Sequence, residues 1–217
     1  MQKIGGAGIL TILVVLVLVW GFAGLYIIDP PEEGVVLRFG QYHATTEPGP
    51  HWAPYFVDRV EKVNVDQIRR AEIGFRSSSG AQSIASEALM LTRDENIIDI
   101  QFAVQYRVKD SKNYLFAVKD PDTTLRQATE SAVREVVGRT DMDYVLTQGR
   151  SDVASQVLTL TQEILDRYKA GLLVTTVNMQ SAQPPEQVQE AFADAVRARE
   201  DEERVKNEAR AFAADIL

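Results

Sequence analysis

An uninterrupted apolar run occupies the first part of the chain. Residues 4–28 hold no charged side chain, and Ile9–Trp20 consists almost entirely of Ile, Leu and Val. At about 1.5 Å per residue, a helix of this length crosses a hydrocarbon core of roughly 30 Å. Asp29-Pro30-Pro31 predicts the end of the helix, because proline lacks the amide N–H. We therefore expect a transmembrane anchor over residues 1–28. A cleaved signal peptide is the alternative, disfavoured because the run exceeds the usual apolar core of such peptides.

Alternation of apolar and polar residues marks the strands that follow. It is strictest in Ile98–Val108, which predicts a strand with one face on a core and one face in water. Ala88–Leu91 precedes this strand across the turn-forming residues Thr92–Asn96, so the two segments are expected to form a hairpin. Further predicted strands are Glu33–Gln41, Val60–Val65 and Leu173–Met179, whereas Arg76–Ser86 is expected to be an exposed loop.

Helical spacing replaces alternation in three segments. Pro121 opens the first of them, and Ser151–Ala170 is the second, with Gly171 expected as its C-terminal glycine cap. Residues 186–217 predict a single long helix without glycine or proline. The apolar pattern is still running at Leu217, so we expect the native helix to continue. The fold class is therefore α+β.

Charge and composition narrow the classes of function. The formal net charge of the 217 residues is −8, which argues against a nucleic-acid partner, because phosphate binding requires clustered Lys and Arg. The chain has no cysteine, and this excludes thiol catalysis, disulfides and cysteine-based zinc sites.

The sequence offers no catalytic constellation. His43 and His51 have no metal-ligand spacing to a partner, and no nucleophile elbow or phosphate-binding loop is present. Ser77–Ser79 with a distant lysine would be a Ser–Lys dyad only if the fold assembled it, and a polar linker is the simpler reading. Asp94-Glu95 suits a turn better than a cation site. We predict no catalytic residue, no cofactor and no metal.

Aromatic residues near the end of the apolar run predict contact with a bilayer surface. Trp and Tyr favour the membrane interface, where one end of the ring is apolar and the other is hydrated. The alternative is that the rings of the loop form the core of the first subdomain. The predicted membrane-interface residues are Trp20, Tyr26, Trp52, Pro54, Tyr55 and Phe56.

An interrupted apolar stripe on the last helix predicts contacts with other subunits. We expect its first half to pack on the chain's own domain and its second half on neighbouring subunits, although a solvated surface helix is the simpler alternative. The predicted oligomerisation residues are Val188, Phe192, Val196, Val205, Phe212 and Ile216.

Several long segments together resemble the stomatin/prohibitin/flotillin/HflK-C superfamily, known as the SPFH or band-7 family, and in particular its bacterial HflK branch. The resemblance covers nearly all of the chain after the apolar run. It runs through Glu32–Tyr42, Glu47–Trp52 and Val60–Arg69, and continues through Leu91–Val108, Tyr114–Gly138 and Pro184–Glu202. It implies a transmembrane anchor (1–28), two SPFH subdomains (29–96 and 97–185) and the start of a long coiled-coil helix (186–217).

The resemblance also implies a function. It predicts a non-enzymatic scaffold that joins an HflC-like partner in a large cage around an FtsH-like membrane protease of the AAA+ class. The resemblance also implies a location on the periplasmic face of the inner membrane. Lys3 before the apolar run independently favours a cytoplasmic N-terminus with the bulk of the chain on the other side of the membrane. The alternatives are a lipid-organising scaffold of the stomatin or prohibitin type, and a membrane-associated hydrolase whose residues meet only in the fold.

Overall fold

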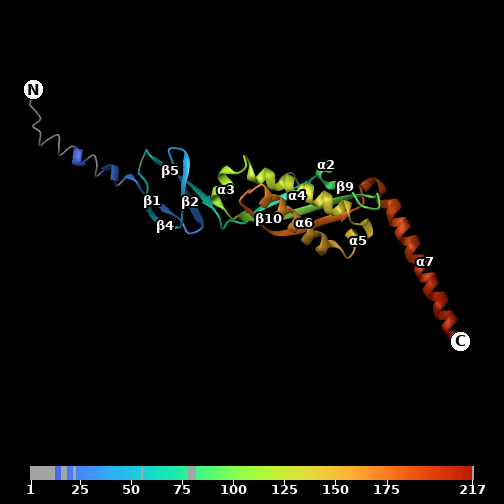
Figure 1. The fold of residues 1–217 in the computed structure, drawn as a ribbon. Helices are drawn as coiled ribbons and strands as arrows, with labels where there is room; N and C mark the ends of the chain where they lie inside the picture. The colour runs from blue at the N-terminus through green and yellow to red at the C-terminus, as the bar shows by residue number, and fades with distance from the viewer. Residues whose placement is uncertain (1–12, 16–18, 22, 55, 78–81, 217) are drawn as a thin grey trace, which may run out of the picture. The chain divides into compact units, whose positions relative to one another are not determined.

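The computed structural model describes residues 13–15, 19–21, 23–54, 56–77 and 82–216 (Figure 1). Strands dominate the first half of the described chain and helices the second, which is the mixed α+β content that was predicted. The chain forms two compact units that interleave along the sequence. Unit 1 draws on residues 1–71, 104–129 and 158–176, and unit 2 on residues 72–103, 130–157 and 177–217. The domain limits expected at residues 28, 96 and 185 stay predictions.

Two small antiparallel sheets form the N-terminal part of unit 1. One sheet pairs β1 with β4, and the other has the strand order β3–β2–β5. Ile28, Val35, Val36 and Val63 are buried between these strands. The strands are β1 (Leu25–Ile28), β2 (Glu32–Arg38), β3 (Gln41–Thr46), β4 (Gly49–Trp52) and β5 (Asp58–Asn64).

The apolar run does not continue as a helix to Ile28, so that part of the prediction was wrong. Residues 13–15 and 19–21 are helical, but Leu25–Ile28 is strand β1, in register with Gly49–Trp52 of β4. Gly24 permits this pairing, because a Cβ there would collide with the Ala53 carbonyl oxygen and the Trp52 indole. Among the described residues, no helix combines the length and the apolarity that crossing a bilayer requires.

A four-stranded sheet contributes strands to both units. Its order is β11–β10–β6, and β9 also pairs with β10. The predicted hairpin is confirmed, with Leu91 opposite Ile97 and Met90 opposite Ile98. The expected loop over Arg76–Ser86 instead carries the short pair β7–β8 and the start of α2. The strands are β6 (Arg69–Ile73), β7 (Phe75–Arg76), β8 (Gln82–Ser83), β9 (Leu89–Leu91), β10 (Ile97–Val108) and β11 (Leu172–Gln183).

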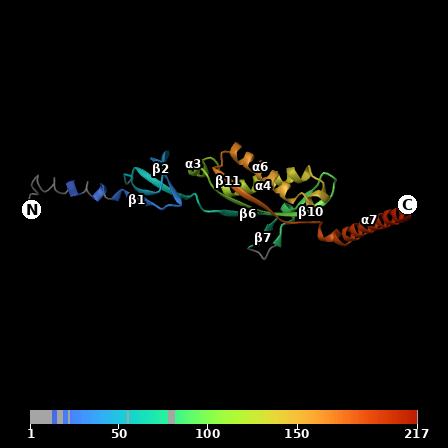
Figure 2. The same ribbon diagram turned by 90° about the horizontal axis from the view of Figure 1, so that it is seen from below.

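Helices cover the apolar face of this sheet. Alternate β10 side chains from Ile98 to Val108 are buried, and α4 and α6 lie along one face of the strands (Figure 2). In unit 1 the buried helical residues include Leu125 and Leu165, and in unit 2 they include Val133 and Val157. The helices are α2 (Ala85–Ala88), α3 (Ser111–Phe116), α4 (Pro121–Gly138), α5 (Met142–Leu146), α6 (Arg150–Arg167), η2 (Glu186–Val188) and α7 (Gln189–Ile216).

Helix α6 ends at Arg167, and the residue that caps it lies two positions before Gly171. Lys169, at φ 54°, takes the cap position that was expected of Gly171, although Gly171 is also left-handed at φ 70°. The Ala170 N–H donates to the Leu165 carbonyl (3.0 Å) and the Lys169 N–H donates to the Asp166 carbonyl (3.1 Å), which is the Schellman pattern. Gly171 serves close packing instead, because a Cβ there would lie 2.5 Å from the Asp110 carbonyl oxygen.

One edge of the sheet is closed by a side chain. Strand β11 is the terminal strand, and the Gln162 amide of α6 lies against its outer edge. Gln162 Oε1 accepts from the Val174 N–H (2.9 Å), and its Nε2 donates to the Leu172 carbonyl (3.2 Å). The amide thus makes the two hydrogen bonds that a neighbouring strand would make at this point.

Candidate membrane-facing and assembly surfaces

Pairing of β1 with β4 gathers apolar side chains on one exposed face. Leu25 lies opposite Trp52 and Ile27 opposite Pro50, so these side chains share a face by strand alternation. Leu25 and Ile27 are largely exposed and Trp52 is 51% exposed. We call Leu25, Ile27 and Trp52 the β1–β4 face. The sequence did not single out Leu25 and Ile27, because both lie within the predicted anchor, where apolar residues are expected.

The predicted interface aromatics separate into two groups. Trp20 contacts Trp52 edge-to-face at 6.0 Å between ring centroids, and the Trp52 indole N–H donates to the Gly21 carbonyl (2.7 Å). Tyr26 instead pairs with His51, with ring centroids 5.8 Å apart, on the opposite side of the β1–β4 pair. The structure therefore joins Trp20 to the β1–β4 face and separates Tyr26 from it.

The loop after β4 and the β2–β3 turn present a second group of exposed apolar side chains. One of them, Phe39, was not predicted from the sequence. Phe56 is 87% exposed and Phe39, in the β2–β3 turn, is 80% exposed. Both have positive φ, 76° and 49°, which non-glycine residues adopt only where the surrounding contacts impose it. Both line a cavity of about 610 Å³ together with Phe116 of α3. Pro54 is partly buried, and Tyr55 lies outside the described residues.

An ion pair fixes the base of the Phe39 turn. Arg38 Nε and Nη2 donate to the two Asp58 carboxylate oxygens at 2.8 and 2.9 Å. These hydrogen bonds lower the pKa of Asp58 from its ordinary value. The Phe39 N–H also donates to the Val57 carbonyl (3.0 Å), so the Phe39 turn and the Phe56 loop are tied together. A phenylalanine directly before a turn glycine, Phe39-Gly40, was the sequence signal that marks this site.

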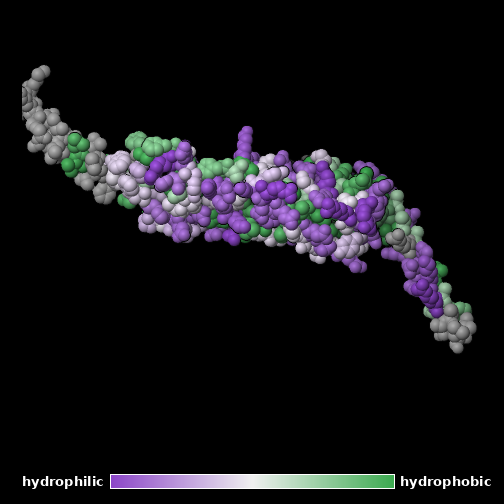
Figure 3. Space-filling view, viewed as in Figure 1, coloured by the Kyte–Doolittle hydropathy of each residue, from purple (hydrophilic) through white to green (hydrophobic). Residues whose placement is uncertain are grey.

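The apolar residues of α7 point in two directions. Phe192 is half-buried beside its own unit, whereas Val205 and Phe212 are 56% and 70% exposed. At about 100° per residue, Val205 lies roughly 220° around the helix axis from Phe192, which is nearly the opposite side. Val188 and Val196 flank Phe192 and are partly exposed, and α7 extends through Ile216. Figure 3 shows hydrophilic colouring along most of the described part of α7.

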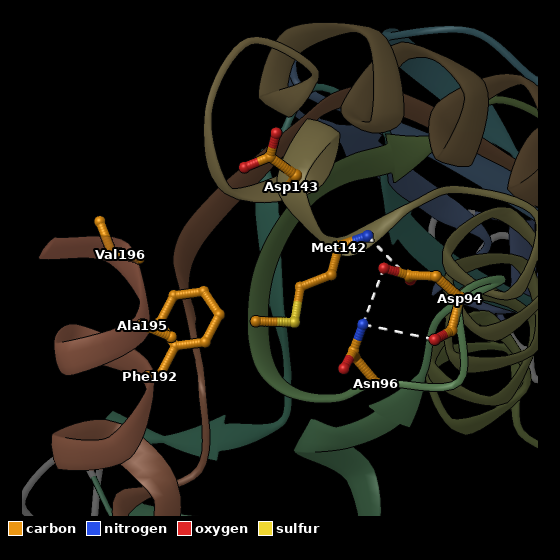
Figure 4. Close-up of a pocket in the computed structure, with 7 residues that line it drawn as sticks. All are labelled: Asp94, Asn96, Met142, Asp143, Phe192, Ala195 and Val196. Carbon is orange, nitrogen blue, oxygen red and sulfur yellow. Dashed lines mark hydrogen bonds between the residues drawn. The ribbon is translucent and has the colours of Figure 1, made fainter. Parts of the chain in front are cut away.

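The start of α7 forms one wall of a pocket of about 240 Å³ in unit 2 (Figure 4). Phe192 and Met142 point toward one another across it. Asp94 organises the opposite wall, because its carboxylate accepts from the Thr92 hydroxyl (2.6 Å), the Asn96 amide (2.7 Å) and the Met142 N–H (3.1 Å). The Asp94-Glu95 segment is thus a hydrogen-bonded turn, as the sequence favoured.

Acid is expected to weaken this turn. The Thr92 hydrogen bond, with those from Met142 and Asn96, lowers the pKa of Asp94 below its ordinary value of 3.8. Its stabilising contribution is therefore complete above pH 3.8 and is lost as the pH falls through the lower folded-state value. We expect Asp94→Asn to be less stable than wild type at pH 7, with the gap closing toward pH 2 in thermal melts. Glu163→Gln, at an exposed carboxylate, serves as the control, and a gap that stayed constant with pH would contradict the assignment.

A group of titratable side chains around Arg69 holds strands and helices together. Arg69 Nη1 donates to the Tyr114 hydroxyl (2.5 Å) and lies 3.4 Å from Asp122 Oδ1, to which the Tyr106 hydroxyl also donates (2.9 Å). Burial, with the Asp122 hydrogen bond, raises the pKa of Tyr106. The cluster therefore keeps Tyr106 neutral and connects β6 and β10 to α3 and α4. The Ser77 hydroxyl donates to Glu72 (2.6 Å), and no group of three metal-ligating side chains occurs in the described residues.

Residues 26–213 match the SPFH domain / Band 7 family. The chain belongs to this family. Among curated SPFH relatives, Protein HflK of Vibrio cholerae is 44% identical over 213 residues, covering 98% of this chain and 51% of the relative. The Modulator of FtsH protease HflK of Escherichia coli K12 is 38% identical over 214 residues, covering 99% and 48%. The Protein HflK of Treponema pallidum is 36% identical over 190 residues, covering 84% and 58%.

The SPFH match confirms the resemblance drawn from the sequence, including its HflK branch. The chain spans about half the length of the curated relatives that it matches. Because the match starts at residue 26, all of strand β1 except Leu25 lies within the matched SPFH domain.

Proposed function

We propose that this chain is an HflK-like scaffold subunit that assembles with an HflC-like partner into a large cage and regulates an FtsH-like membrane protease. The observation that carries the proposal is the alignment of 99% of the chain with a protein named as a modulator of FtsH protease. The exposed apolar surfaces of both units supply contact area of the kind that an assembly buries. The proposed role is non-enzymatic.

We also propose that the β1–β4 face and Phe56 seat unit 1 on the outer leaflet of the bacterial inner membrane. Apolar side chains exposed at turns and strand edges cost free energy in water and gain it at the membrane interface. Leu25 and Ile27 lie at the C-terminal end of the apolar run of residues 4–28, and pairing of β1 with β4 sets Trp52 beside them, which would bring this face to the bilayer surface. Lys3 before the apolar run supports a cytoplasmic N-terminus, with the described strands and helices in the periplasm.

Lipid-confined quenchers are expected to reduce Trp52 fluorescence in the full-length protein in vesicles. The chain has only two tryptophans, so Trp20→Phe makes Trp52 the sole reporter. Brominated lipids should quench it by about half or more, because a ring at the interface lies within contact of the acyl chains.

The matched control carries Trp20→Phe, Trp52→Phe and Tyr168→Trp, which moves the reporter to an exposed position after α6. Equal quenching of the two reporters, or none of Trp52, would show that the β1–β4 face does not contact lipid.

A lipid-organising scaffold without a protease partner is the second candidate, favoured by the same membrane-facing surface. The experiment that separates the two is a gentle-detergent pull-down of the tagged full-length protein, followed by native sizing and mass spectrometry. A megadalton-scale species with an HflC-like protein and an FtsH-like protease would support the first proposal. A large homo-oligomer without protease would support the second, and a monomer would contradict both.

A further inference from the structure

The pocket between α7 and α5 has one wall that is held in place before anything binds. The Arg93 N–H donates to the Thr140 carbonyl (3.0 Å), and Arg93 Nε donates to Asp141 (2.8 Å). The Met142 N–H is bound to Asp94, as described above. These contacts fix the turn of residues 92–96 against the start of α5. This wall is therefore preorganised, which lowers the entropic cost of docking.

The pocket joins an apolar floor to an acidic rim. Phe192, Ala195 and Val196 of α7 line one side of the pocket and Met142 faces them from the other, and we call these four apolar residues together its floor (Figure 4). Asp94 and Asp143 are the ionisable residues of the lining, and both are acidic. Within the described part of the chain, the Asp143 carboxylate has no ion-pair partner. The matching occupant is a long cationic side chain, whose methylene stem packs on the floor while its head meets the carboxylates.

An arginine suits the pocket because its guanidinium also stacks on an aromatic ring such as that of Phe192. Arg197 of this chain is exposed, and its guanidinium forms no ion pair or hydrogen bond with the described residues. At about 100° per residue it lies roughly 140° around α7 from Phe192, so it is turned away from its own pocket. In an assembly whose long helices run side by side in register, Arg197 would lie level, along the helix axis, with the pocket of the adjacent subunit.

We propose that the pocket of Asp94, Met142, Asp143, Phe192 and Val196 is a socket for an arginine or lysine from the first turns of the long helix of the adjacent subunit. The inference rests on the proposed assembly and adds its specific contact. Each subunit then contributes a socket on one side and a basic side chain on the other. This heterologous arrangement repeats around a closed ring.

Cross-linking in the full-length complex tests which segment enters the socket. Because the chain has no cysteine, Asp143→Cys provides a single thiol for a benzophenone label. After irradiation, we expect mass spectrometry to find the start of the long helix of another subunit, with isotope-labelled copies separating contacts between chains from those within one. The same label at Glu163→Cys is the control. Products confined to the labelled chain, to lipid or to the protease would overturn the proposal.

Charge reversal tests the electrostatic part. We expect Asp143→Arg to lower the fraction of protein in the large assembly about tenfold, because it sets two cations against each other, while Glu163→Arg leaves it unchanged. Circular dichroism of Asp143→Arg and Asp143→Asn checks that the fold is retained. If wild type assembles and folded Asp143→Arg assembles equally well, the socket is wrong and the proposed function stands. If wild type does not assemble, both are wrong.

Discussion

Replacing Phe102 by alanine is expected to lower the free energy of unfolding by about 3–5 kcal/mol. Phe102 lies in β10 with none of its surface exposed, in the row of buried side chains that faces the helices. Alanine removes the apolar contacts of the ring and leaves a cavity that the close-packed surroundings fill only in part. Urea unfolding followed by circular dichroism measures the change.

Phe116→Ala is the matched control, because half of the Phe116 surface is already exposed. It should cost less than about 1 kcal/mol. Equal losses in the two variants would mean that the β10 row is not the core of unit 2.

Replacing Phe212 by glutamate in the full-length protein is expected to reduce the large assembly at least tenfold. The residue is 70% exposed on the side of α7 that points away from Phe192, so the described contacts give it no role in the fold. A buried glutamate in a helix–helix interface would be an unpaired charge, which costs several kcal/mol. Native sizing in gentle detergent measures the assembled fraction, and Ile216→Glu should act in the same direction.

Asn207→Glu is the control on the same helix. It adds the same charge at an exposed position, roughly 140–160° around the axis from Phe212 and Val205. Its assembled fraction should equal that of wild type. If Phe212→Glu also assembled fully, the side of α7 that carries Val205 and Phe212 would be a solvated surface, and the subunits would have to associate through other residues.

The central elements were predictable because each has a strong period of its own. Ile98–Val108 alternates without interruption, and the helices after Pro121 and Ser151 repeat their apolar residues at helical spacing. In such segments the spacing of apolar residues decides the secondary structure, and that spacing can be seen in the sequence of the segment itself.

Strand β1 was not predictable, because its partner decides its structure. Leu25–Ile28 has the composition of the preceding apolar run, and only pairing with Gly49–Trp52 makes it a strand. A short apolar segment fits a helix or a strand equally well until its contacts are known. The same pairing decides that Tyr26 and Trp52 point to opposite sides, which composition cannot reveal.

The backbone conformations of individual residues were also not predictable from the sequence. Gly171 was predicted as the helix cap, yet Lys169 takes the cap position, and Gly171, also left-handed, makes room for α3. Phe39 and Phe56 likewise hold positive φ values although neither is a residue that favours them. The assembly role of the α7 residues stays a prediction, and the division of Phe192, Val205 and Phe212 between two sides of the helix required its geometry.

The glutamine that closes the edge of β11 has a consequence for the newly made chain. Free strand edges recruit other strands, and a crowded cell offers many of them during synthesis. Gln162 precedes β11 in the sequence, so its helix is available before the strand that it covers has emerged. The amide can therefore occupy the edge as soon as β11 pairs with β10, which leaves little time for a neighbouring nascent chain to add a strand and begin aggregation.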